Sequence, residues 1–437
     1  MKLLFVATNR LRSMMLPMPV GLASIAAQMD DSHHELQMLD LMFSEQPDAD
    51  LAAALLGFAP DLVAFSVRNL DNQSYLGLEY YLPEAKNLVE LCRKHSEAIV
   101  VVGGAAFTVA PASVFEYLAP DFGIAGEGEI SFPRLVAQIE AGIDCSDLPG
   151  LVWRENGRVE RNPARPIGDL DSLAAPRRDL FDSGRYAAEG GFGSVVTKLG
   201  CSFRCSYCEV PHTAGDRWRT KSPDRVTDEM LQIRRNARAP KVMFCDAIFN
   251  YPMDHAKQVC RAIIRRDLDI PWAASVHPAF LDRELVALMR DSGCIAASLS
   301  CDSGSEQMLK TLRKGFSAEQ LRASAELLEE MELRYALWLL IGGPGENRRT
   351  VEESHQFLIQ REPIIVNMLV GIRLMPHTAL AATAAEQGLI SADDPLMEPK
   401  FYLSPGVQGW IGDYLTRICS EHPNWSCAQS CSQYSSQ

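Results

Sequence analysis

The 437-residue sequence lacks any long apolar run. No stretch approaches the roughly 18 consecutive apolar residues of a membrane-spanning helix, so we expect no membrane segment. The apolar start from Met1 to Ala7 ends at Thr8, which is too short for the apolar part of a signal peptide. We therefore expect a cytoplasmic protein.

The sequence also lacks a block of basic residues. It has 42 lysines and arginines against 56 aspartates and glutamates, and the resulting net charge of −14 is spread along the chain. This distribution argues against a surface that follows nucleic-acid phosphates or binds an anionic membrane. We expect a small molecule as the principal partner, and neither nucleic acid nor membrane.

Twelve cysteines are present, but in a long chain without an export signal they are more easily explained as buried thiols and metal ligands than as a disulfide framework. The composition is 47% hydrophobic and 22% charged, as in globular proteins that bury large cores. At about 150 residues per domain, the length suggests about three structural units. We see no internal repeat.

Residues 1–142 alternate short apolar runs with amphipathic stretches. Continuous apolar strands separated by helices indicate βαβ units, so we expect a doubly wound, flavodoxin-like domain with a five-stranded parallel sheet. The expected strands are Lys2 to Ala7, Glu35 to Asp40, Asp61 to Ser66, Ile99 to Val102 and Phe122 to Ala125. Such sheets bind ligands at the carboxyl ends of their strands.

The rest of the chain divides into three parts. Residues 143–191 are rich in Pro, Gly, Asp and Arg and are expected to form a linker with a small hairpin at Glu155 to Gly157. In residues 192–390 six further strand and helix patterns predict a partial (β/α)6 barrel, with its chemistry on the loops after the strands. Residues 391–437 show a weaker pattern and form a C-terminal extension.

Three cysteines follow the first predicted barrel strand. Cys201, Cys205 and Cys208 are spaced C-x3-C-x2-C on one loop. A structural zinc site would need four ligands, whereas three thiolates suit a [4Fe-4S] cluster with one iron open to a small molecule. The alternative is a set of buried or zinc-binding thiols.

With the segments that follow it, this loop resembles the radical S-adenosylmethionine (SAM) superfamily, and more narrowly its cobalamin-binding branch. The resemblance covers about residues 1–390. It implies that Cys201, Cys205 and Cys208 each bind one iron of a [4Fe-4S] cluster, that SAM binds the fourth iron, and that Tyr207 lies near the adenine of SAM.

Three later barrel segments match the family in order. They imply SAM contacts from the following residues: Asp246, Asp302, Ser303, Gly342 and Gly343. Asp302 stands where the family usually has glutamate, and its shorter carboxylate could still accept a ribose hydroxyl. Its alternative role is the N-cap of a helix. The glycines allow close approach of the backbone to SAM.

A histidine marks a departure from the family. His377 lies in the segment Met375 to Thr378, where the family usually has Pro-Gly-Thr. Its imidazole could position a substrate or move a proton, which makes it the candidate catalytic residue. A structural or surface histidine is the alternative.

Residues 1–142 resemble the cobalamin-binding domain of this branch. The implied cobalamin contacts are Ser66, Arg68, Asn69, Gly103, Gly104, Gly126 and Glu127. No Asp-x-His-x-x-Gly motif occurs, so we expect cobalamin to bind with its own base displaced and without a histidine on cobalt. Arg68 could lie near that lower face, or could serve as a surface or capping residue. A domain that no longer binds cobalamin is the alternative.

The remaining cysteines could have several roles. Cys419, Cys427 and Cys431 could ligate an auxiliary metal centre, act as redox-active thiols, or lie incidentally in a loose polar tail. Cys245 and Cys301 are expected at strand ends that face the SAM cavity.

The resemblance implies a cobalamin-dependent radical SAM C-methyltransferase that acts on an unactivated carbon of a small biosynthetic intermediate. Reduced cluster would cleave SAM to a 5′-deoxyadenosyl radical, and methylcobalamin would supply the methyl group. An external electron donor such as flavodoxin or ferredoxin is implied. The alternatives are a non-methylating reaction of the same branch (ring formation, rearrangement or heteroatom exchange) and a cofactor-binding sensor without turnover. Neither the substrate nor the oligomeric state follows from the sequence.

Overall fold

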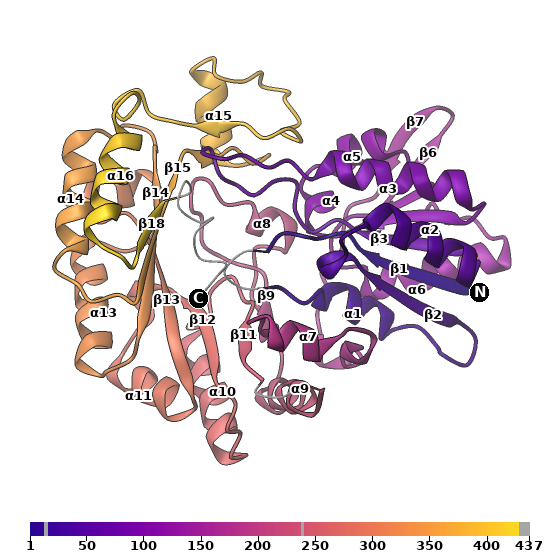
Figure 1. Ribbon diagram of the computed structural model, residues 1–437, viewed down its shortest axis with the longest axis horizontal. Helices are drawn as coiled ribbons and strands as arrows, with labels where there is room; N and C mark the ends of the chain where they lie inside the picture. The colour runs from indigo at the N-terminus through magenta and orange to yellow at the C-terminus, as the bar shows by residue number, and fades with distance from the viewer. Residues whose placement is uncertain (13–15, 237–239, 428–437) are drawn as a thin grey trace.

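The computed structural model describes residues 1–12, 16–236 and 240–427. They form two α/β units that lie side by side, the first from indigo to purple and the second from pink to yellow in Figure 1. Within these ranges, no helix combines the length and the apolar character needed to cross a bilayer. The two units confirm the predicted fold class.

The first unit is built on a seven-stranded sheet in the order β2-β1-β3-β4-β5-β6-β7. The first five strands run parallel and the last two antiparallel. The strands are β1 (Lys2–Ala7), β2 (Glu35–Asp40), β3 (Leu62–Ser66), β4 (Ile99–Gly103), β5 (Phe122–Ile124), β6 (Leu151–Glu155) and β7 (Arg158–Arg161). The central strands are runs of Val, Leu, Phe and Ala buried on both faces, as parallel sheets require.

Helices cover both faces of this sheet. One face packs against α1 (Val20–Ala26) and α6 (Gly128–Ala141). The other packs against α2 (Pro47–Phe58), α3 (Leu82–His95), α4 (Ala105–Val109) and α5 (Pro111–Leu118). This arrangement leaves the carboxyl ends of β1, β3, β4 and β5 at one edge, which points toward the second unit.

The second unit contains a seven-stranded parallel sheet in the order β18-β15-β14-β13-β12-β11-β8. Its strands are β8 (Gly193–Val195), β11 (Val242–Phe244), β12 (Trp272–Val276), β13 (Cys294–Asp302), β14 (Tyr335–Ile341), β15 (Ile365–Val370) and β18 (Trp425–Cys427). Six of them correspond to predicted strands. The seventh, β18, comes from the C-terminal segment and was not predicted, because three residues are too few to show a periodic pattern.

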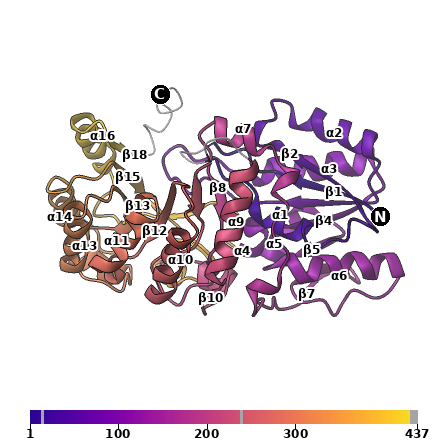
Figure 2. The same cartoon turned by 90° about the horizontal axis from the view of Figure 1, so that it is seen from below.

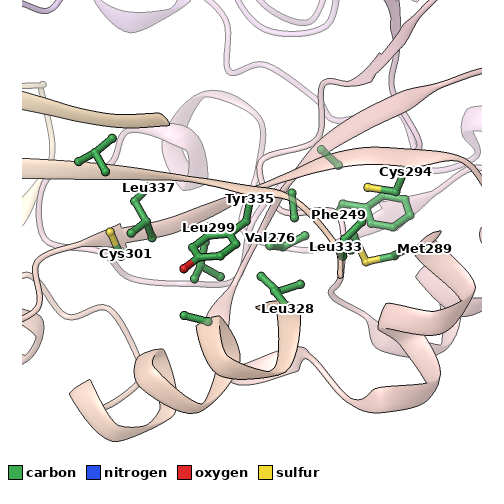
Figure 3. Packing of buried hydrophobic residues seen from close by; sticks show 14 of the residues in the cluster. Phe249, Val276, Met289, Cys294, Leu299, Cys301, Leu328, Leu333, Tyr335 and Leu337 are labelled. Atoms are coloured by element: carbon green, nitrogen blue, oxygen red, sulfur yellow. The ribbon is translucent and has the colours of Figure 1, made fainter. Parts of the chain in front are cut away.

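Helices pack on the outer face of this curved sheet. They are α9 (Pro223–Asn236), α10 (Met253–Arg265), α11 (Arg283–Asp291), α12 (Glu306–Thr311), α13 (Ala318–Glu330), α14 (Arg348–Leu358) and α16 (Ile411–Glu421). Figure 3 shows part of the resulting core, in which Leu328 of α13 lies beneath Leu299 and Tyr335 of the sheet. All three side chains are at most 1% exposed. The inner face and the carboxyl ends of the strands remain available for chemistry.

The segment between the units binds to both of them. Its hairpin, β6 and β7, extends the first sheet, and the short helix α7 (Ser183–Ala188) packs near α9 at the junction in Figure 2. Between them, Arg178 is fully buried and forms a 2.8 Å ion pair with Glu229 of α9. Its guanidinium also donates to the carbonyl oxygen of Ser194, 2.7 Å away. The segment is therefore held by buried polar contacts.

Two further ion pairs join the units directly. Asp71, on the loop after β3, accepts from the Arg373 guanidinium at 2.8 Å, and their side chains are 1% and 3% exposed. Glu127, on the turn before α6, pairs with Arg219 of β10 (Arg219–Thr220) at 2.5 Å. Buried charges are stable only when paired, so separating the units would leave these four charged side chains without their partners.

The Asp71–Arg373 pair predicts a large stability effect. We expect Asp71→Asn to lower the free energy of unfolding by about 3 kcal/mol, because it leaves the Arg373 cation buried without a counter-charge. The matched control is Glu330→Gln, which breaks the exposed Arg283–Glu330 pair and should have little effect. Urea unfolding followed by circular dichroism compares the variants. Equal losses in both would contradict the role of the buried pair.

Candidate functional site

A cavity of about 450 Å³ lies between the two units. The first unit contributes residues at the carboxyl ends of its strands, and the second contributes Ser194, Leu199 and Cys245 from the ends of β8, β9 (Lys198–Leu199) and β11. Leu170 and Tyr186 of the linking segment complete the wall. The carboxyl ends of the first sheet's parallel strands thus face β8 and the end of β11 across one shared space.

Six of the seven predicted cobalamin contacts line this cavity. They are Ser66, Arg68, Gly103, Gly104, Gly126 and Glu127. The seventh, Asn69, does not line it, but its side-chain amide lies 3.1 Å from that of Asn9, which does. The structure therefore brings these predicted residues together at one edge of the first sheet, beside the cavity.

Two of these residues have structural partners within the chain. Gly104 has a φ of +102°, and a Cβ there would lie 2.5 Å from the carbonyl oxygen of Val67. Glycine is therefore required at position 104, because the backbone there approaches that of Val67 closely. The Glu127 carboxylate is occupied by Arg219 and by the backbone N–H of Ile167, 2.8 Å away. Through its ion pair with Arg219, Glu127 joins the two units.

Arg68 has a different environment. Its guanidinium lines the cavity and forms no ion pair with any residue in the described part of the chain. Burial lowers the pKa of Arg68, with the Cys245 thiol and Tyr186 nearby. An uncompensated cation in a cavity favours a ligand that carries carbonyl or anionic oxygens.

A carboxyl group that the sequence analysis missed also lines the cavity. Asp40, at the end of β2, accepts a 2.7 Å hydrogen bond from the Tyr186 hydroxyl. Burial raises the pKa of Asp40. Only the position of Asp40 at the end of a predicted strand could be inferred from the sequence. Its contact with Tyr186 could not, because the two residues are 146 positions apart.

The three-cysteine loop follows β9. Cys201 is buried, and Cys205 and Cys208 are partly buried. Backbone hydrogen bonds fix the loop, from the Cys201 N–H to the Gly215 carbonyl oxygen at 3.0 Å and from the Ser206 N–H to the Leu312 carbonyl oxygen at 2.9 Å. Burial raises the pKa of all three thiols, and that of Cys208 reaches about 12.

The fold places these three thiols on one loop. In the ranges covered by the structure, no group of three or more His, Cys, Asp or Glu side chains converges as a metal site. The donor set itself, three thiols on one short loop, fits a [4Fe-4S] cluster with one open iron.

Phe203, inside this loop, anchors it by aromatic packing. Its ring stacks on His277, with 4.7 Å between centroids, and also contacts Phe280, Tyr251 and Trp218. The Trp218 indole N–H donates to the Ser202 hydroxyl at 2.9 Å. The cysteines are therefore carried by a rigidly packed loop.

Tyr207 and Asp302 meet next to this loop. The Tyr207 hydroxyl donates to the Asp302 carboxylate, and the Lys314 ammonium lies 2.6 Å from the same carboxylate. Burial alone would lower the pKa of Lys314, but the charges of Asp302 and its neighbours raise it well above its usual value. Lys314 was not predicted from the sequence, because a single lysine after a helix carries no pattern of its own.

Asp302 is not a helix cap. Helix α12 begins at Glu306, and its N-cap is Ser305, so that alternative is wrong. Ser303 is buried and its hydroxyl lies 3.0 Å from that of Ser354, while it accepts from the Ser305 N–H at 3.1 Å. Asp302 has a φ of +59°, which places its carboxylate against Tyr207 and Lys314.

Asp246 is fully engaged inside the protein. It accepts from the backbone N–H of Thr197 at 2.7 Å and from the Lys198 ammonium at 2.9 Å, and neither side chain of the Lys198–Asp246 pair is exposed. These contacts fix the strand that leads into the cysteine loop. Asp246 therefore helps to fix the position of the cysteine loop.

Gly342 and Gly343 form the expected turn after β14. Gly342 has a φ of +121°, a backbone conformation that residues other than glycine rarely adopt. The backbone N–H groups of both glycines donate to the Glu346 carboxyl, at 2.5 and 3.0 Å. Burial raises the pKa of Glu346 to about 7. This carboxyl closes the turn, a role not foreseen from the sequence.

His377 faces a second histidine. It has a φ of +63°, is exposed, and its ring centroid lies 5.9 Å from that of His212 on α8 (Val210–Thr213), directly after the cysteine loop. Burial and the His377 ring lower the pKa of His212. His377 does not line the cavity.

The remaining cysteines are placed as follows. Cys419 lies on α16 and Cys427 on β18, and their thiols are hydrogen-bonded. The interpretation of these two as part of a loose tail is therefore wrong, while Cys431 lies outside the described residues. Cys245 lines the cavity, and the buried Cys301 thiol donates to the Trp338 carbonyl oxygen at 3.0 Å.

Comparison with protein families matches both units. The B12 binding domain model matches residues 15–136, and the Radical SAM superfamily model matches residues 195–358. The chain belongs to the cobalamin-binding radical SAM enzymes. The cofactors of this enzyme are accordingly a [4Fe-4S] cluster, SAM and cobalamin.

Individual relatives extend over nearly the whole chain. An uncharacterised methyltransferase of Pyrococcus horikoshii is 29% identical over 414 residues, covering 91% of this chain and 88% of the relative. The tryptophan 2-C-methyltransferase of Streptomyces laurentii is 25% identical, covering 84% and 72%. The solved radical SAM methyltransferase TsrM of Kitasatospora setae, with cobalamin and a [4Fe-4S] cluster bound, superposes with a TM-score of 0.80 at 23% identity over 93% of this chain and 84% of that one.

The raised pKa of Glu346 predicts a pH effect on stability. The folded chain holds a proton up to about pH 7 that the unfolded chain releases near its usual value of 4.5. Glu346 therefore favours folding fully below about pH 4.5, and this contribution, roughly 3 kcal/mol, is lost as the pH rises through 7.

Glu346→Gln tests this assignment. The glutamine amide oxygen can accept from the same two N–H groups without ionising, so the free energy of unfolding should fall less between pH 5 and pH 8 than in the wild type. Glu352→Gln, an exposed residue on α14, is the control. Urea unfolding at each pH gives the slopes. An unchanged slope in Glu346→Gln would contradict the assignment.

Proposed function

We propose that this enzyme is a cobalamin-dependent radical SAM methyltransferase that methylates an unactivated carbon of a small biosynthetic intermediate. One observation supports this best, namely the cavity between the carboxyl ends of the first sheet and the strands β8 and β11 of the second. Methyl transfer needs the methyl donor and the activated carbon in one enclosed space, where positioning replaces random encounter. The methyltransferase names of the relatives point the same way.

For the cluster, we assign Cys201, Cys205 and Cys208 as ligands. Burial raises the pKa of all three thiols, and a cluster binds thiolates, so binding of the cluster is coupled to release of protons. When bound, the cluster supplies the electron that converts SAM into a radical. The packing of Phe203 keeps the loop in place, and an external donor such as flavodoxin or ferredoxin would supply the electron.

For SAM, we assign contacts from Tyr207, Asp302, Ser303, Gly342 and Gly343. The Asp302 carboxylate is shared by Tyr207 and Lys314, so its orientation toward a ribose hydroxyl is fixed in advance. Lys314 places a buried cation beside this group, which suits a carboxylate.

Asp246 was expected to touch SAM, and we now assign it a positioning role. Both of its oxygens are occupied by Thr197 and Lys198, and so its effect on SAM passes through the strand before Cys201.

For cobalamin, we assign the cavity residues Ser66, Arg68, Gly103, Gly104, Gly126 and Glu127, with Asn69 behind them. Arg68 offers the uncompensated cation of the cavity and Ser66 a small hydroxyl at the end of β3. Glu127 contributes by fixing the turn to Arg219. Cobalamin, when bound, supplies the methyl group.

His377 remains the candidate for substrate contact. It lies beside His212, at the point where the cysteine loop meets the loop after β16 (Ile372–Arg373). Either imidazole could orient a substrate or hold a proton. A cytoplasmic location completes the proposal.

The proposal is tested with anaerobically reconstituted protein and SAM that carries a deuterated methyl group. Iron, sulfide and cobalamin are measured first, followed by 5′-deoxyadenosine and product mass with candidate acceptors, beginning with tryptophan. We expect about one cobalamin per chain and a product that gains the deuterated methyl group. Formation of 5′-deoxyadenosine with an acceptor converted but not labelled indicates a non-methylating reaction. Absence of both 5′-deoxyadenosine and label transfer from a loaded enzyme would indicate a sensor.

The cluster assignment has its own test. We expect Cys205→Ala to abolish the cluster absorption and SAM cleavage while the protein stays folded, because two thiolates cannot hold the cluster. Cys92→Ala, at a buried cysteine of α3 in the first unit, is the control and should keep its iron. Iron analysis, absorption spectra and circular dichroism give the result. Full cluster iron and SAM cleavage in Cys205→Ala would overturn the assignment.

A further inference from the structure

A buried histidine lies directly beside the cysteine loop. His277 follows strand β12 and is only 3% exposed. Its ring stacks on that of Phe203, with 4.7 Å between the centroids and 17° between the ring planes. Phe203 stands between Cys201 and Cys205 in the sequence. The imidazole therefore supports the part of the loop that carries two of the three assigned cluster ligands.

Both ring nitrogens of His277 have partners within the chain. Nε2 lies 3.0 Å from the carbonyl oxygen of Lys314, and because a carbonyl can only accept, Nε2 carries the proton and donates. Nδ1 accepts from the backbone N–H of Ala279 at 3.2 Å. Burial lowers the pKa of His277 to about 4, so the ring keeps this neutral form near neutral pH. Neither nitrogen is left to bind iron, and the ring acts through its neighbours.

The backbone of His277 is held by a buried amide. Asn250 is fully buried, and its side-chain oxygen accepts from the His277 N–H at 2.8 Å. Its side-chain nitrogen donates to the carbonyl oxygens of His277 and Phe280, at 2.9 and 2.7 Å. These three hydrogen bonds fix the turn Pro278–Phe280 that follows the histidine. The position of the imidazole is therefore set at its backbone as well as at its ring.

Lys314, on the other side of His277, belongs to the assigned SAM site. Its carbonyl oxygen accepts from His277, and its ammonium lies 2.6 Å from the Asp302 carboxylate and donates to the Tyr207 hydroxyl at 3.2 Å. The Lys314 side chain is 5% exposed. Without the His277 donor, the buried carbonyl of Lys314 would lose its partner, and the backbone that carries the cation could shift.

The imidazole thus makes two contacts of different kinds. Its flat face stacks on Phe203 of the cysteine loop, and its Nε2–H donates to Lys314 of the SAM site. A phenylalanine at position 277 could supply the ring but not the donor, and a glutamine could supply a donor but not the ring. The two contacts can therefore be removed separately.

We propose that His277 is a positioning residue that fixes the cysteine loop through Phe203 and the Lys314 cation through its backbone carbonyl. It touches neither cofactor, and it holds their two binding sites in a constant relation. The inference rests on the proposed function, in which the three cysteines bind the cluster and Tyr207 and Asp302 bind SAM. It assigns the ring stacking to cluster retention and the hydrogen bond to SAM affinity.

Two variants of the full-length, anaerobically reconstituted enzyme test this assignment. We expect His277→Phe to release cluster iron to a chelator at the wild-type rate but to raise the Kd for SAM about tenfold, because the hydrogen bond is lost. We expect His277→Gln to keep the wild-type Kd for SAM but to release iron roughly threefold faster, because the stacked ring is lost. Absorption follows iron release, and equilibrium dialysis gives the Kd.

His255→Phe is the matched control. His255 lies on α10 of the same unit, and its Nε2 is 2.8 Å from the carbonyl oxygen of Lys221. This variant loses the same kind of contact, an imidazole bonded to a lysine carbonyl, away from the cysteine loop. It should leave both iron release and the Kd for SAM unchanged. Circular dichroism establishes that each variant is folded.

Other outcomes overturn the inference. An unchanged Kd for SAM in folded His277→Phe defeats the role of the hydrogen bond, and unchanged iron release in His277→Gln defeats the role of the stacking. Equal loss of both properties in the two variants indicates a general packing role and also overturns the proposal. If His277→Phe does not fold, His277→Gln alone decides, since it must lose iron faster while it keeps its SAM affinity. Failure of the wild type to bind cluster or SAM would instead defeat the proposed function.

Discussion

The structure depends on the fixed opposition of two sheet edges across one cavity. Parallel strands gather loop residues and helix N-termini at their carboxyl ends, and here two such edges face each other. The buried pairs Asp71–Arg373 and Glu127–Arg219 hold them in place. Each pair joins a residue of the first unit to one of the second. Breaking a buried pair costs free energy, so the pairs keep the two units at a fixed spacing. The cavity is therefore a property of the assembled chain and of neither unit alone.

Carboxylates in this molecule mainly organise the backbone around the site. Asp246 fixes the strand before the cysteine loop, Glu346 closes the glycine turn, and Glu127 ties a cavity turn to the barrel. Each satisfies buried N–H groups or cations, which would otherwise be costly. Arg68 stands out against this background, because it lines the cavity and forms no ion pair with any residue that the structure describes. A ligand with carbonyl or anionic oxygens would satisfy this cation.

The sequence predicted the parts that depend on local pattern. Strands such as β1 and β14 were found because continuous apolar runs are required for burial on both faces, and the cysteine loop was found by its spacing. Strand β18 is only three residues long, and the partners of Asp246 and Asp302 lie far along the chain, so no periodicity could reveal them. Likewise, the residues at the cavity edge of the first sheet could be predicted from the strand ends, whereas the pairing of Glu127 with Arg219 depends on how the two units pack.

The cavity contains positive groups although the chain as a whole is acidic, and one of them follows from topology. The chain carries a net charge of −14, yet its cavity contains the unpaired Arg68 cation and the N-terminus of α6. In a doubly wound sheet each helix that follows a strand starts at the carboxyl edge, so its positive end points toward the ligand regardless of surface charge. Acidic residues in such a space are favoured when they are paired, as Glu127 is with Arg219. A cofactor with anionic and carbonyl oxygens is therefore compatible with an acidic protein, because the fold sets the local potential.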